Sequence, residues 1–269
     1  MKFLKYLLRT MVIDRRILVW SMMFSIFFDV LTVFFLSHIG QGPVNPSSVR
    51  EIESIDYGLI FMLSMSFAAV SISSSFAVQS RSFGYLFRYT KSTRSWYMLN
   101  LIVAMSILFL ILGSIIFGVN WLFNYERYRI DAAPSSLPGI IALAPAEGLL
   151  VSGVTLATFS LFITYTGYRH LNYIRFLPIY IYFAADFSII EAGVHGTLYY
   201  LSPFLSSTYL AIYLYSGSKK FPFNTVAPYS VDPHLALISL VISILISYAA
   251  SIIFMKRIRS SGSDDERLF

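Results

Sequence analysis

Two acidic residues lie inside long apolar runs of this sequence and are the first candidates for chemistry. Asp29 stands near the middle of the run 17–39, and Asp186 stands within the run 176–192. A carboxylate at the centre of a membrane-spanning helix costs about 2.5–3.5 kcal/mol on insertion scales, so both side chains are expected to face protein or a watery cavity. Two interpretations stay open for each: a residue that lines a transport pathway, or a hydrogen-bonded or protonated partner between helices.

Glu191 and His195 form a second candidate pair. On a continuous helix, residues four apart share a face, and this pair could then bind a metal or relay a proton. Gly193 stands between them and can interrupt the helix, and two ligands alone make an incomplete metal site. A polar turn at the outer membrane boundary is therefore the favoured interpretation, and no metal site is predicted.

Small residues follow one stripe of the run 57–78, at Ser64, Ala68, Ser71 and Ser75. Spacings of four, three and four place them on one helix face, where small side chains allow another helix to approach closely. Helix packing is the favoured interpretation, and a stripe that faces a cavity is the alternative.

The sequence lacks the motifs of common active sites. It contains no G-x-x-x-x-G-K-[ST], no G-x-S-x-G and no H-E-x-x-H, and it has no cysteine. The chain is therefore expected to bind no ATP by a P-loop, to carry no thiolate metal site and to be no enzyme.

Composition indicates a membrane protein. Of the 269 residues, 57% are hydrophobic and only 13% are charged, and the net charge is +6. Long apolar stretches with few charges are typical of membrane-spanning helices of about 20 residues. Nucleic acid is not an expected partner, because the basic residues are not gathered on a soluble domain.

The sequence predicts an all-α fold with six transmembrane helices in the domain 17–255 of a cell-membrane protein. Fifteen of the 20 lysines and arginines fall in 1–16, 79–95, 169–175 and 256–269. Basic residues favour the cytoplasmic side, so both termini are expected there, which requires an even number of crossings. The predicted spans are 17–39, 57–78, about 96–123, about 147–168, about 176–192 and 235–255.

Three segments are predicted around these spans. Residues 1–16 have basic and apolar residues on opposite helix faces, which is typical of an amphipathic helix in the membrane surface; a basic flank to the first span is the alternative. The apolar stretch at about 193–215 is predicted to form a re-entrant hairpin. Residues 256–269 are a predicted cytoplasmic tail, and the outer connections before 57 and before 147 are predicted to be loops.

A basic, half-apolar segment, "QSRSFGYLFRYTKSTRS", separates the second and third spans. Phe83, Leu86 and Phe87 can form the apolar face of a short helix, while Arg81 and Arg88 stay solvated. Such a helix either rests on lipid headgroups or enters a groove on a partner.

This segment resembles the loop after the second span in the membrane subunits of ABC exporters of the second type. The similarity rests on Arg81, Gly84, Leu86, Thr90 and Arg94. The chain lacks the glutamate that is common near this arginine. The surface helix, the six spans and the hairpin opened by Ser202 and Pro203 are similar to that family as well.

The resemblance implies a permease subunit that pairs with a second permease subunit, identical or different, in the lipid bilayer. A separate ATPase, which would bind ATP and Mg, would dock on the helix containing Arg81, Phe83, Gly84, Leu86, Phe87, Arg88 and Thr90. The first, second and fifth spans would line the pathway, which makes Asp29, Ser64, Ser71, Ser75 and Asp186 pathway candidates. The alternative is a proton-coupled secondary transporter that uses Asp29 and Asp186. A third class, an intramembrane enzyme, would depend on Glu191 and His195.

Overall fold

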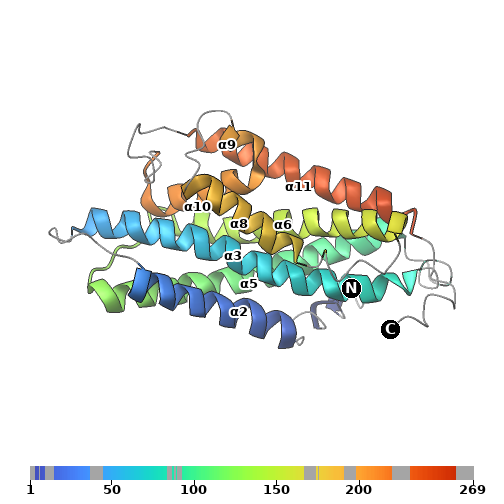
Figure 1. The fold of residues 1–269 in the computed structure, drawn as a ribbon, viewed down its shortest axis with the longest axis horizontal. Helices are drawn as coiled ribbons and strands as arrows, with labels where there is room; N and C mark the ends of the chain where they lie inside the picture. Colours follow the sequence, from blue (N-terminus) through green and yellow to red (C-terminus); the bar gives the residue numbers. More distant parts are fainter. Residues whose placement is uncertain are drawn as a thin grey trace.

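The computed structural model describes residues 4–5, 7–9, 15–36, 45–83, 87, 89, 93–166, 174, 176–190, 198–219 and 231–258. Its elements are helices, and the described residues contain no strand. In chain order they are α2 (Arg15–Val30), the π-helix η1 (Leu31–Leu36), α3 (Pro46–Ser80), α5 (Arg94–Tyr128), α6 (Leu137–Thr166), α8 (Leu177–Ile190), α9 (Leu198–Leu201), α10 (Pro203–Ser216) and α11 (Pro233–Met255) (Figure 1).

The prediction of an all-α fold is confirmed for the described residues, and their long apolar helices are compatible with a membrane protein. Four of the described helices, α3, α5, α6 and α11, are long and apolar enough to cross a membrane. The helices α2 and α8 are shorter. The count of six spans and the re-entrant hairpin stay predictions.

Two helices begin earlier in the chain than predicted, so two expected outer loops are partly helical. Helix α3 begins at Pro46, where the Asn45 N–H donates to the Ser48 hydroxyl over 3.1 Å. Helix α6 begins at Leu137, where the Ser136 hydroxyl accepts from the Gly139 N–H over 3.3 Å. Serine caps and a proline in the first turn are ordinary helix starts, and they extend both helices beyond their apolar runs.

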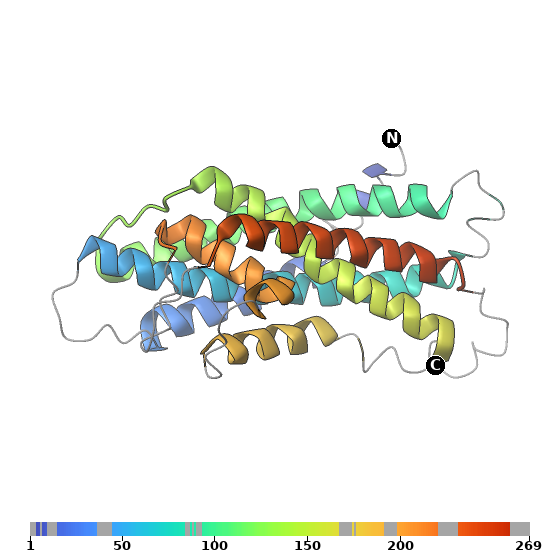
Figure 2. The ribbon, with the colours of Figure 1, turned by 90° about the horizontal axis from the view of Figure 1, so that it is seen from above.

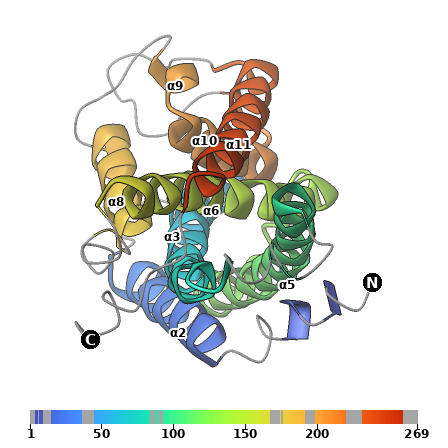
Figure 3. The ribbon, with the colours of Figure 1, turned by 90° about the vertical axis from the view of Figure 1, so that its right-hand side faces the viewer.

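Helix α3 is the centre of the bundle. It packs against α2, α5, α6, α8 and α10, and Figure 3 shows it between α2, α6 and α5 in the end-on view. Helix α11 packs mainly on α6 and α10, and many of its apolar side chains are exposed on its other side. A mostly exposed apolar face suits contact with lipid.

The long helices place their connections at two opposite ends. Figures 1 and 2 both show the last turns of α3, α6 and α11 and the first turns of α5 at one end, which we call the Ser80 end. The first turns of α3 and α6 and the last turns of α5 lie at the other, the Pro46 end. The Ser80 end therefore carries the connection between α3 and α5 and the end of α11.

Little of the predicted surface helix 1–16 lies within the described residues. Leu7 is buried, and Leu4 and Leu8 pack beside it on the hydrophobic core, whereas Lys5 and Arg9 are on the outer side. A surface helix at this position stays a prediction.

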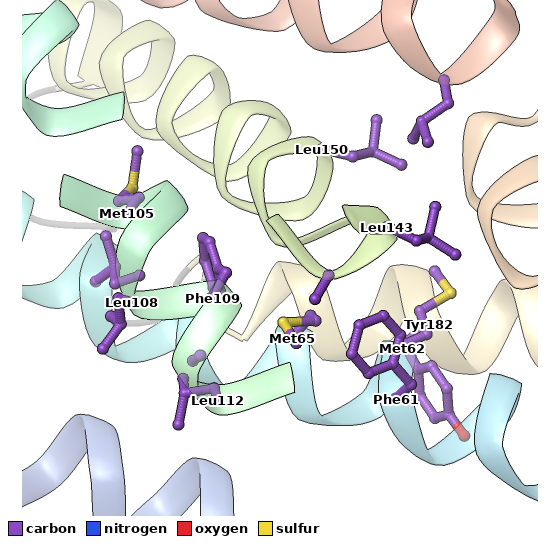
Figure 4. Close-up of a cluster of buried hydrophobic side chains, with 14 of the residues drawn as sticks. Phe61, Met62, Met65, Met105, Leu108, Phe109, Leu112, Leu143, Leu150 and Tyr182 are labelled. Carbon is purple, nitrogen blue, oxygen red and sulfur yellow. The ribbon is translucent and has the colours of Figure 1, made fainter. Parts of the chain in front are cut away.

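The hydrophobic core joins α3, α5 and α6. Figure 4 shows Phe61 and Met65 of α3 near Phe109 of α5 and Leu143 of α6. Two glycines bring α5 and α6 together: a Cβ on Gly113 would lie 2.4 Å from the Ala144 Cβ, and a Cβ on Gly148 would lie 2.2 Å from the Phe109 ring. The close approach of the two helices therefore depends on both glycines.

Gly148→Ala is expected to lower the free energy of unfolding by about 1–3 kcal/mol, because the new methyl group overlaps the buried Phe109 ring. Gly118→Ala is the matched control, since nothing lies within 4 Å of a Cβ at this helical glycine. It should be neutral or slightly stabilising. Unfolding in mixed micelles, followed by circular dichroism, compares the two; equal stability of both variants would contradict the tight α5–α6 contact.

Candidate functional site

Polar side chains from five helices are buried in the half of the bundle toward the Pro46 end. None of them is more than 6% exposed. We call this set the polar interior; it consists of Asp29 of α2, Glu53, Asp56 and Tyr57 of α3, Asn120 and Asn124 of α5, Glu147 of α6 and Tyr215 of α10. Buried polar groups in an apolar bundle are costly and mark functional sites by default.

Asp29 is tied to helix α5 by a side-chain hydrogen bond. The Asn120 amide nitrogen donates to Asp29 Oδ1 over 2.7 Å, and Asn124 donates in turn to the Asn120 carbonyl over 3.0 Å. Both asparagines are fully buried. The structure therefore shows Asp29 as a hydrogen-bonded partner between helices. A role of Asp29 in lining a transport pathway stays a prediction.

The chain changes from α-helix to π-helix directly after Asp29. The π-helix η1 covers Leu31–Leu36, where the sequence predicted a continuous transmembrane helix. Phe34 packs edge-on against Phe123 of α5, with ring centroids 6.0 Å apart. Short π-helical stretches are rare and occur often at functional sites. The position of η1, close to Asp29 in the chain, is therefore a second indication that this region is functional.

Asp56 lies near one acidic and one basic side chain. These are Asp29 of α2 and Arg127 of α5. Its Oδ2 atom is buried and has no hydrogen-bond partner within the part of the chain that the structure describes. Asp56 thus links the Asp29 group of α2 and α5 to the carboxyl groups of α3.

Glu53 and two tyrosines continue the polar interior toward α10. The Tyr215 hydroxyl donates to Glu53 Oε2 over 2.9 Å. The Tyr57 ring packs against the Tyr215 ring, with centroids 5.6 Å apart. The Tyr57 hydroxyl is buried without a hydrogen-bond partner among the described residues.

Glu147 is the most isolated acid of the set. Its side chain is completely buried, and neither carboxyl oxygen has a hydrogen-bond partner in the described ranges. The Ser207 hydroxyl lies beside Glu147, but its geometry fits donation to the Phe204 carbonyl, over 2.9 Å, better than donation to the carboxyl group. The described residues hold no cluster of three or more His, Cys, Asp or Glu side chains that could bind a metal ion.

The first residue of the serine stripe of α3, Ser64, contacts a neighbouring helix. The Ser64 hydroxyl lies within hydrogen-bond distance of the Ser25 hydroxyl on α2. Ser71 and Ser75 are half-buried, and the Ser71 hydroxyl lies 3.5 Å from the Phe67 carbonyl of the preceding turn. These contacts support the packing interpretation for Ser64.

The structure does not describe the side chains of the remaining candidates. Asp186 belongs to α8, but its side chain lies outside what the structure describes. Glu191 and His195 lie outside the described residues altogether. Their predicted roles stay predictions.

The segment after α3 is fixed by an aromatic cluster, which we call the aromatic anchor: Phe76, Phe83, Phe87 and Tyr97. The Phe83 ring lies 5.5 Å from Phe76 on α3, 5.2 Å from Phe87 and 5.0 Å from Tyr97 on α5, centroid to centroid. Only 4% of Phe83 is exposed. Phe83 therefore packs on its own chain, which differs from the prediction that it inserts into a partner's groove.

Two further contacts hold the anchor to α3 and α5. The Arg94 guanidinium lies over the Phe87 ring, 5.4 Å from its centroid, and the Tyr97 hydroxyl donates to Gln79 Oε1 over 2.6 Å. Arg81 and Tyr89 are exposed. Gly84, Leu86, Arg88 and Thr90 lie outside the described residues.

Sequence reasoning missed Glu53, Asp56 and Glu147 as interior residues because their stretches were assigned to loops or span boundaries. The signal was present: Pro46 directly follows Asn45, and Pro138 stands two residues after Ser136, and a capping residue with a proline in the first turn is typical of a helix start. Helices that begin there carry the three acids one or more turns inside the bundle.

A comparison of the chain with protein-family models, with curated proteins and with solved structures finds no match. The polar interior and the aromatic anchor are therefore the features from which a function can be inferred.

Proposed function

We propose that this chain is the permease subunit of an ATP-driven exporter, which forms half of a translocation pathway and couples to a separate ATPase subunit through the segment 81–93. The observation that carries the proposal is the aromatic anchor. A basic segment between two long, central helices is joined to both of them by buried aromatic rings. Such a joint transmits a push on the segment to α3 and α5.

The exposed residues of the segment supply a docking surface. Arg81 is exposed, and Tyr89 is 73% exposed. Aromatic residues and arginine are the residue types that contribute most binding energy at protein interfaces. With Phe83 buried in its own chain, the docking energy is assigned to Tyr89 and Arg81.

The arrangement of the helices supports a cytoplasmic position for this surface. The segment and the end of α11 share the Ser80 end (Figure 1), and both carry basic residues. Basic residues favour the cytoplasmic side, where ATP is available. Six spans, a re-entrant hairpin containing α10, and a pair of permease subunits complete the proposal.

The polar interior is the proposed lining of the pathway. It lies toward the Pro46 end, the outer side in this orientation, and it contains Asp29, which the sequence marked as a pathway candidate. A proton-coupled secondary transporter is the second candidate function. The buried carboxyl groups favour it, because such transporters place their coupling residues inside the helix bundle.

Co-purification tests the first proposal against the second. A tagged chain expressed in its native host should retain an ATPase subunit, and Tyr89→Ala should lower that retention about tenfold, which corresponds to about 1.4 kcal/mol of binding energy. Phe35→Ala is the matched control: Phe35 is 70% exposed but belongs to η1, outside the proposed docking surface. If no nucleotide-hydrolysing partner is retained by the native chain, the secondary transporter becomes the better account.

A further inference from the structure

We propose that Glu147 is a proton-binding site inside the helix bundle, and that Tyr57, Tyr215 and Glu53 form the route by which protons reach it from the Pro46 end. The inference rests on the packing of α3, α6 and α10. It does not depend on an ATPase partner, and it holds for either of the two candidate functions.

Glu147 lacks the contacts that stabilise a buried carboxylate. Both of its oxygens are buried without a hydrogen-bond partner among the described residues, and no ion pair within those residues reaches it. An ionised carboxylate in such a place carries a large desolvation cost, and among the described residues only the neighbouring Ser207 hydroxyl offsets part of it. The neutral acid is the form that the surroundings tolerate, and forming it requires a proton.

Among the side chains that the structure describes, the groups beside Glu147 are neutral. Helix α3 presents the Tyr57 hydroxyl, and α10 presents Ser207. Helix α5 contributes the Phe109 ring, which packs on Gly148. Helix α11 contributes Tyr248, whose hydroxyl lies 2.9 Å from the Ser152 hydroxyl, farther along α6. None of these groups supplies a positive charge, so proton binding is the available means of neutralisation.

Helix α6 is locally loosened beside Glu147. Pro145 lies inside the helix and has no N–H, so the Ile141 carbonyl cannot receive its usual helical hydrogen bond from that position. Prolines are tolerated in membrane helices where neighbouring groups or water can satisfy the freed carbonyl. The region around Glu147 therefore combines a backbone carbonyl that lacks its helical donor with a carboxyl group that lacks a hydrogen-bond partner among the described residues.

A chain of hydroxyl groups connects Glu147 to a second acid. Tyr57 is an electrostatic neighbour of Glu147 on one side and of Tyr215 on the other. The Tyr215 hydroxyl donates to Glu53 Oε2 over 2.9 Å, and Glu53 Oε1 has no partner in the described part of the chain. The four groups follow in the order acid, phenol, phenol, acid, and three of them have oxygen atoms without a hydrogen-bond partner among the described residues. Such atoms are the ones that water molecules bridge.

The route ends near the surface at Glu53. Its electrostatic neighbours include Arg50 and the exposed residue Asp131, which lies in the connection between α5 and α6. A hydronium ion at this end gives a proton to Glu53. Each phenol oxygen then accepts a proton and releases its own, and Glu147 changes from carboxylate to carboxylic acid while one water molecule is left at the entrance.

Infrared spectroscopy of the purified full-length chain in lipid tests the site. The carboxylic-acid C=O band of the wild type should lose one component in Glu147→Gln at neutral pH, because the substitution removes one protonated carboxyl group and keeps the side-chain shape. If the spectra of the two proteins are identical in this region, Glu147 is not protonated and the proposal is overturned.

Hydrogen–deuterium exchange of the same band tests the route and keeps Glu147 in place, so it does not depend on the folding of the glutamine variant. Transfer into D₂O should shift the Glu147 component at least about tenfold more slowly in Tyr57→Phe and Tyr215→Phe than in the wild type. Tyr209→Phe is the matched control, since Tyr209 is also buried on α10 but its hydroxyl donates to the Val231 carbonyl over 2.8 Å. Equal exchange rates in all four proteins would overturn the route. Because no ATPase is present, this result stands or fails separately from the co-purification experiment.

Discussion

Phe83→Ala is expected to detach the segment 81–93 from the helix bundle and to abolish coupling between the proposed ATPase and transport. The Phe83 ring contacts Phe76, Phe87 and Tyr97 and is almost fully buried. Replacing a buried phenylalanine with alanine costs about 3–5 kcal/mol. That loss falls on a short segment whose other described ring contact with the helices is that of Phe87, which packs against Tyr97 and lies under the Arg94 guanidinium.

The bundle itself should survive this substitution, because Phe83 lies beyond the end of α3, at the Ser80 end of the hydrophobic core, and the other core residues of α3, α5 and α6 stay in place. Limited proteolysis within the segment should accelerate at least about tenfold, while the helical circular-dichroism signal stays unchanged. Transport-coupled ATP hydrolysis should fall to the uncoupled level. Phe83→Leu is the control that keeps apolar volume at the site, and it should give an intermediate result. Unchanged proteolysis and coupling in Phe83→Ala would show that the contacts of the Phe83 ring neither hold the segment on the bundle nor couple it to α3 and α5.

The amphipathic pattern identified Phe83 and Phe87 as apolar residues that must be covered, but it could not identify what covers them. Spacing within one segment reports which side chains share a face. The covering groups, Phe76 and Tyr97, belong to the two flanking helices, and their proximity arises only when α3 and α5 pack in antiparallel fashion (Figure 1). A partner's groove and the chain's own helices were therefore indistinguishable from the sequence.

The polar interior was hidden for a different reason. Hydropathy identified the long helices well, as the agreement of α11 with its predicted span 235–255 illustrates. The stretches before 57 and before 147 were predicted to be loops because their Pro, Gly and Ser content is typical of turns. The same residue types also begin helices, and Glu53 and Glu147 are each fully buried on a helix that extends past its apolar run. Asp29 was found because it interrupts an apolar run, whereas the two glutamates lie at the edges of theirs.

Asp29→Leu and Asn120→Leu are each expected to destabilise the protein, and the double variant is expected to recover much of the loss. In Asp29→Leu, the buried Asn120 amide loses its acceptor, which costs about 1–3 kcal/mol. In Asn120→Leu, the buried Asp29 carboxyl loses its donor, which costs somewhat more because a potentially charged group is left without a partner. The double variant leaves neither group unsatisfied. A coupling free energy of about 1–3 kcal/mol, measured by unfolding in mixed micelles, is therefore expected.

Transport by the double variant then separates the two interpretations of Asp29. If Asp29 only joins α2 to α5, a double variant with recovered stability should transport at close to the wild-type rate. If Asp29 lines the pathway, the same variant should be stable and inactive, and we expect this second outcome because η1 interrupts the α-helix directly after Asp29. Asp29→Asn adds the finer test, since asparagine keeps an oxygen acceptor for Asn120 but has no titratable group. Loss of transport in that variant at unchanged stability would assign the role to the carboxyl group itself, whereas full transport in both variants would leave Asp29 as a helix contact.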